Sequence, residues 1–73
     1  MRKLYLKVER LNSPTAKEAA EILRLSPGAC PVFFYETVSA RYVALKGVTV
    51  DPADMTLGAL RALLGGENVV LKS

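Results

Sequence analysis

The sequence predicts an α+β domain in which a four-stranded antiparallel sheet carries two helices on one face. Apolar residues alternate with polar or aromatic ones in two segments, and two short apolar runs complete a set of four strands. Two other segments repeat apolar residues at the helical period of three or four. The 73 residues suit one small domain and leave no room for a second, so residues 1–73 are expected to form a single unit.

The four strands are expected at residues 3–9, 31–35, 41–46 and 69–71. The short gap between the second and the third makes them a hairpin. Gly47 marks a bulge, after which residues 48–50 extend the third strand. Alternation then places one set of side chains beneath the helices: Leu4, Leu6, Val8, Val43, Leu45, Val69 and Leu71.

Two starts fit the first helix. Ser13 followed by Pro14 is one, because Ser caps helices and Pro is favoured in their first turn. A capping box of Thr15 and Glu18 is the other. The apolar face that follows is rich in alanine, and the Ser-Pro-Gly sequence at residues 26–28 ends the helix.

The second helix follows an acidic, proline-containing segment. Asp54 or Thr56 is expected to cap it, and the pair Asp51 and Asp54 is interpreted as helix-capping carboxylates and not as a metal site. The glycines at residues 65–66 end this helix, because glycine adopts the backbone conformation that the last carbonyls require.

The resulting order, β-α-β-β-α-β, has a compact solution in the split βαβ arrangement, also called the ferredoxin-like sandwich. Right-handed crossovers then place both helices on the same face of the sheet. The other face, called the open face below, is left uncovered. Alternation assigns to it Lys3, Tyr5, Lys7, Phe33, Tyr35, Tyr42, Ala44, Lys46, Val70 and Lys72.

The open face combines aromatic side chains with four of the five lysines. One interpretation is structural: strands expose lysines, and the aromatics form cross-strand pairs. The other is a docking face for a protein domain or for single-stranded nucleic acid. Both remain open at this point, and the candidate docking residues are Tyr5, Lys7, Phe33, Tyr35, Tyr42, Lys46 and Lys72.

The composition excludes several kinds of chemistry. The absence of His excludes a Ser-His-Asp triad, a Cys-His pair and a His-ligated zinc site. Cys30 is the only cysteine, cannot form an internal disulfide, and is interpreted as a small structural residue. No catalytic, cofactor-binding or metal-binding residue is expected. The longest uncharged run has 11 residues and contains two prolines, which is too short to cross a membrane, so we expect a cytoplasmic protein.

Several segments, taken in order, resemble one family. They are Lys-Leu-Tyr-Leu-Lys-Val at residues 3–8, Ser-Pro-Gly at 26–28 followed by Pro-Val-Phe-Phe-Tyr at 31–35, Val-Asp-Pro at 50–52, and the Leu-Leu-Gly-Gly-Glu-Asn-Val-Val-Leu-Lys stretch at 63–72. Together they are similar to the C-terminal domain of the bacterial DNA polymerase III alpha subunit. The sequence departs from that pattern in having Ser-Pro-Gly where relatives often have His-Pro-Gly, and Gly58 within the second helix.

This resemblance implies a non-catalytic C-terminal fragment of a much larger DNA-directed DNA polymerase, whose catalytic modules would lie upstream. It also implies a role in DNA replication through protein contacts in the replisome, notably with the tau subunit of the clamp loader. The preceding domain of the same chain is another expected partner for the open face.

An alternative function is that of a single-stranded nucleic-acid-binding module. Residues 4–8 resemble the first-strand motif of RNA-recognition domains, which stack bases on sheet aromatics. The third predicted strand lacks the Gly-Phe step that such domains carry. A small-molecule regulatory module of similar topology is a third option, but no ligand pocket is marked in the sequence.

Overall fold

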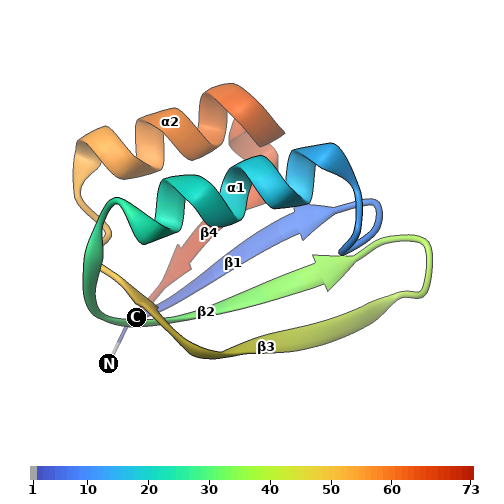
Figure 1. Ribbon diagram of the computed structural model, residues 1–73, viewed down its shortest axis with the longest axis horizontal. Coiled ribbons are helices and arrows are strands. Elements are labelled where there is room, and N and C mark those ends of the chain that lie inside the picture. The colour runs from blue at the N-terminus through green and yellow to red at the C-terminus, as the bar shows by residue number, and fades with distance from the viewer. Residues whose placement is uncertain (1) are drawn as a thin grey trace.

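The computed structural model describes residues 2–73 and contains the four expected strands and the two expected helices in the expected order, with one short turn that was not expected. They are β1 (Lys3–Val8), α1 (Pro14–Arg24), β2 (Pro27–Glu36), β3 (Arg41–Val50), α2 (Asp54–Leu64), a short 3-10 turn η1 (Gly66–Asn68) and β4 (Val69–Lys72). Both helices lie on the same side of the sheet, and the opposite side is uncovered (Figure 1). The α+β class and the placement of both helices on one face are therefore confirmed.

The prediction of an antiparallel sheet is wrong. The strand order is β3-β2-β1-β4, and β1 pairs in parallel with β2, whereas both outer pairs are antiparallel. In the split arrangement another strand separates the two parallel ones, but here they are direct neighbours. Burial explains the difference. β2 carries the bulky run Val-Phe-Phe and suits a central position, whereas β3 has Ala, Gly and Thr positions, buries only Val50, and suits an edge.

The core lies between the helices and one face of the sheet. Its largest fully buried side chains are Leu4, Leu6, Leu23, Val32, Val50 and Leu60. Val8 and Val69 are also buried, as alternation predicts. Val43, Leu45 and Leu71 are only half-buried, because they lie on the two edge strands where the helix layer covers less of the sheet.

The first helix begins as one of its two predicted starts requires. The Ser13 hydroxyl accepts a hydrogen bond from the Ala16 N–H at 3.2 Å, and Pro14 occupies the first turn. The Ser-Pro start is thus confirmed, and the alternative box of Thr15 and Glu18 does not form the cap.

The second helix begins differently from its prediction. Its N-cap is Ala53, which provides no side-chain hydrogen bond, so capping by Asp54 or Thr56 is wrong. The buried Thr56 hydroxyl instead hydrogen-bonds the Ser26 hydroxyl at 2.6 Å, which ties the start of α2 to the segment that follows α1. Gly65, with φ of 97°, ends α2 as predicted.

The hairpin of β2 and β3 is longer than the sequence predicts, with β2 beginning at Pro27. The bulge at Gly47 is confirmed, because its φ of 75° accompanies a register shift between the two strands. Beyond it, Val50 points into the core although it lies an odd number of residues from Leu45. The bulge therefore lets both halves of β3 face the helices.

Candidate docking face

The register of the three strands β1, β2 and β3 gathers aromatic side chains on the open face. Tyr5 lies opposite Phe33, and Tyr35 lies opposite Tyr42. Paired positions on neighbouring strands project to the same side of a sheet. Four of the five aromatic residues therefore meet on the open face, and the fifth, Phe34, is buried in the core.

Three ring contacts hold this cluster together. Tyr5 stacks on Phe33 with ring centroids 5.2 Å apart and planes 18° apart. Tyr42 contacts Tyr5 edge to face at 5.9 Å, and contacts Tyr35 at 4.8 Å with the planes inclined by 53°. Such pairs stabilise a structure by about 0.5–1.5 kcal/mol beyond their buried area. The four rings thus form a connected group, and their positions depend on one another.

Two lysines lie against the same rings. The Lys72 Nζ lies 5.3 Å from the centroid of the Tyr5 ring, and the Lys7 Nζ lies 5.9 Å from that of Tyr35. These are cation–π distances. Because neighbouring side chains already contact the ring faces, a partner meets ring edges, phenol hydroxyls and the exposed Tyr42, which is 67% accessible.

A hollow of about 540 Å³ opens within the open face. Tyr5, Tyr35 and Tyr42 form its aromatic wall, and Glu67 and Asn68 of η1 also line it. The sequence pattern does not single out Glu67 or Asn68 as site residues. The only available signal was their position directly after the glycines that end α2, which places them beside β4.

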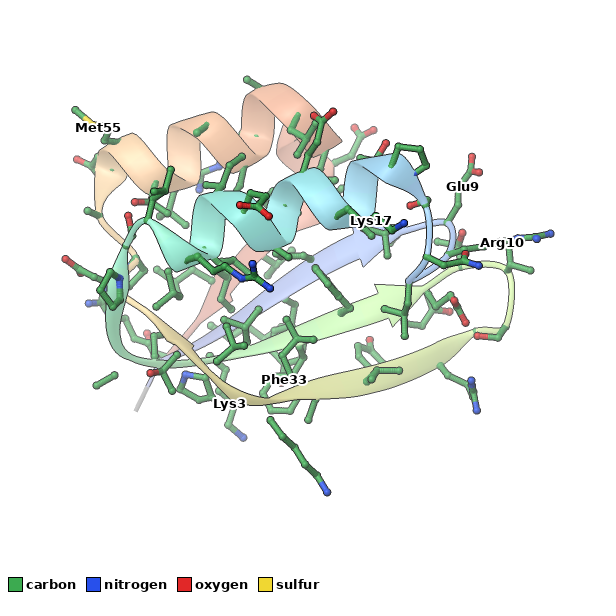
Figure 2. All side chains as sticks on the ribbon, in the orientation of Figure 1. Lys3, Glu9, Arg10, Lys17, Phe33 and Met55 are labelled. Atoms are coloured by element: carbon green, nitrogen blue, oxygen red, sulfur yellow. The ribbon has the colours of Figure 1, made fainter. Side chains whose placement is uncertain are left out.

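All seven candidate docking residues lie on the open face, but the structure separates them by role. Phe33 does not line the hollow and instead supports Tyr5 from β2, and Lys46 lies exposed on the edge strand β3. Figure 2 shows Lys3 and Phe33 on the side of the sheet opposite the helices, whereas Lys17 projects from α1. The other candidates line the hollow: Tyr5, Lys7, Tyr35, Tyr42 and Lys72.

A carboxylate at one end of the sheet joins two loops. Glu36 accepts a hydrogen bond from the Ser39 hydroxyl and one of 2.8 Å from the Leu11 N–H. These hydrogen bonds, with the nearby charges of Arg41 and Arg10, hold the pKa of Glu36 below its ordinary value of 4.5. Glu36 thus fastens the β1–α1 connection to the turn between β2 and β3.

The remaining chemical candidates are isolated. Cys30 is buried, and its thiol donates to the carbonyl of Arg2 at 3.4 Å. Across residues 2–73 no three His, Cys, Asp or Glu side chains gather as a metal site would require. Within the same range, no helix is long and apolar enough to cross a membrane.

Comparison with family models, with curated proteins and with solved structures finds no match to this chain.

Proposed function

We propose that this chain is a non-catalytic protein-docking module, equivalent to the C-terminal domain of a DNA polymerase III alpha subunit, and that it acts in the cytoplasm. Its partner is the tau subunit of the clamp loader, bound through the open face. The ordered sequence resemblance from residue 3 to residue 72 supports the family, and the connected aromatic cluster supports the choice of face.

The observation that carries the docking function is that neighbouring side chains cover the rings of Tyr5 and Tyr35. Tyr5 has Phe33 stacked on it and the Lys72 ammonium over its ring, and Tyr35 is in contact with Tyr42 and lies under Lys7. A base-stacking platform needs free ring faces. Ring edges and hydroxyls suit a protein interface, where tyrosine is enriched at the centre.

The proposed module has no catalytic role of its own. The parent chain would be a DNA-directed DNA polymerase, and its reacting groups would belong to other segments. Nucleotide incorporation by residues 1–73 alone would contradict this part of the proposal.

The second candidate function is binding of single-stranded nucleic acid. It is favoured by the four lysines on the open face, two of which lie against tyrosine rings. A polynucleotide would place phosphates on the lysines, and the lysines would have to leave the rings for bases to stack there.

Titration of the chain with purified tau, and separately with single-stranded oligonucleotides, at two salt concentrations distinguishes the two functions. The docking function predicts saturable binding of tau with moderate salt dependence. Nucleic-acid binding predicts a steep loss of oligonucleotide affinity as salt rises. Oligonucleotide binding without tau binding would replace the proposal by the second candidate. Absence of both would indicate that the open face packs on a preceding domain of the same chain.

A further inference from the structure

The net charge of the protein is concentrated on the open face. Ten basic and seven acidic side chains give a net charge of +3. The open face holds four lysines, and Glu67 is the acidic residue that lines its hollow. The six remaining basic side chains are balanced by the six remaining acidic ones. The rest of the molecule is therefore electrically neutral, and the open face alone attracts anions at long range.

No acidic side chain among residues 2–73 forms an ion pair with a lysine of the open face. Among residues 2–73, the only ion pair joins Glu21 and Arg24 on α1, at 3.5 Å. The register of β1 and β4 also places Lys3 directly opposite Lys72. Like charges at opposed positions of neighbouring strands destabilise a sheet. An anion that approaches this end of the open face would relieve that repulsion.

The distance between the lysines of β1 determines how far apart two negative charges of a ligand should lie. Lys3 and Lys7 lie on the same strand, four residues and therefore about 13 Å apart, and Tyr5 lies between them. In an extended peptide the residues i, i+2 and i+4 face the same side and cover the same length. An acidic residue at i, an apolar one at i+2 and an acidic one at i+4 would match the lysine, tyrosine and lysine of β1.

We propose that the open face recognises an extended acidic protein segment with the pattern acidic-x-apolar-x-acidic. Its carboxylates pair with Lys7 at one end and with Lys3 and Lys72 at the other, and its apolar side chain covers the edges of the Tyr5 and Tyr42 rings. This inference rests on the proposed docking function, because it describes the chemistry of the docked segment. Carboxylates on an extended chain are favoured over nucleic-acid phosphates because the Tyr5 ring at the centre of the lysine pattern is already covered by Phe33 and by the Lys72 ammonium, so a base cannot stack on it without displacing them.

The probe is a synthetic peptide with Glu at i, Phe at i+2 and Glu at i+4, titrated against the full chain. A peptide of the same composition with adjacent glutamates is the register control, and single-stranded oligo-dT is the nucleic-acid control. We expect the patterned peptide to bind more tightly than the register control, and its affinity to fall as salt rises.

Substitution Lys3→Gln gives a second readout, with Lys17→Gln on α1 as the matched control that removes the same charge elsewhere (Figure 2). Removing Lys3 should weaken binding of the patterned peptide about tenfold. It should also raise the melting temperature of the free chain by about 1–5 °C, because one of the two opposed positive charges is removed. Lys17→Gln should leave peptide affinity unchanged. If Lys3 had only a structural role, Lys3→Gln would not raise the melting temperature and lower the peptide affinity together.

The outcomes separate this inference from the docking function. If tau binds but the patterned peptide does not, or binds no better than the register control, the acidic segment is contradicted and docking stands. If oligo-dT binds more tightly than the peptide at the same salt concentration, the acidic-segment proposal fails in favour of nucleic acid. If tau does not bind but the patterned peptide does, with the expected loss in Lys3→Gln, the acidic segment stands and tau is the wrong partner.

Discussion

The two faces of the same sheet carry different kinds of side chain. On the covered face, Leu4 and Leu6 of β1 are completely buried against the helices. On the open face the intervening residues of β1 are Lys3, Tyr5 and Lys7, and the Tyr5 ring stacks on the Phe33 ring of the neighbouring strand. Aliphatic burial on one face supplies stability, whereas the other face carries amphipathic side chains that a second molecule can cover. Under the proposed function, β1 thus serves folding and recognition through alternate residues.

The largest effect is expected from the covered face. Leu6→Ala removes a fully buried side chain from the centre of the core and should lower the free energy of unfolding by about 2–5 kcal/mol. A small domain has little more than that in total, so the variant should be largely unfolded. Urea denaturation followed by circular dichroism measures the loss. Val70→Ala on the open face is the control and should change stability by well under half as much. Equal effects would abolish the distinction between the faces.

The open face should show the reverse behaviour. The double substitution Tyr5→Ala with Tyr42→Ala should weaken tau binding by about 1–3 kcal/mol while the far-ultraviolet circular dichroism spectrum stays native. Isothermal titration calorimetry gives the affinity. Met55→Ala, on the helix layer and also highly exposed, is the control and should bind as the unmodified chain does. Loss of binding in Met55→Ala and not in the double variant would move the interface to the helices.

A change in the helix layer can raise stability without touching recognition. Gly58 lies on the exposed side of α2, and a methyl group there would meet no atom within 4 Å. Gly58→Ala should stabilise the domain by about 0.5–1 kcal/mol, because alanine loses less backbone entropy in a helix. Tau affinity should not change. Gly65→Ala is the contrasting variant and should destabilise, since Gly65 has a φ of +97°. A Gly58→Ala variant that altered tau binding would contradict the separation of the layers.

The smallest effect concerns the loops at the end of the sheet. The pKa of Glu36 is lowered in the folded state by its hydrogen bonds with Ser39 and Leu11. Its contribution is therefore present above the unfolded pKa and is lost as the pH falls through the lower, folded value. Glu36→Gln should be slightly less stable than the unmodified chain at pH 7, and the difference should shrink below about pH 4. Urea midpoints at several pH values test this. If the stability difference between Glu36→Gln and the unmodified chain stays constant with pH, the negative charge of Glu36 does not contribute to stability.

The sequence predicts which residues face the helices, but not which strands are neighbours. Alternation at Leu4, Leu6 and Val8 fixes the buried side of β1 and fits a parallel or an antiparallel partner equally well. The observed choice places in the centre of the sheet the strand with the larger buried apolar run, Val-Phe-Phe in β2, and leaves at the edge β3, which buries only Val50.

The sequence predicts which residues belong to the candidate site, but not how their side chains contact one another. Alternation assigns Tyr5 and Tyr42 to one face, but it does not show that their rings meet across β2, the strand that lies between them in the structure. Glu67 and Asn68 were missed because they belong to a short turn with no periodicity of its own. Local patterns specify the direction of a side chain, and long-range pairing specifies the side chains that it meets.

The most direct test of the central claim uses the distribution of tyrosine. All three tyrosines lie on the open face, so a chain labelled with 3-fluorotyrosine reports on that face alone. Fluorine NMR relaxation by a soluble gadolinium chelate is measured with and without saturating tau. Docking through the open face predicts that tau protects the tyrosine signals, Tyr42 most strongly, from the chelate. Tau that binds by calorimetry but leaves all three signals as accessible as before would contradict the claim.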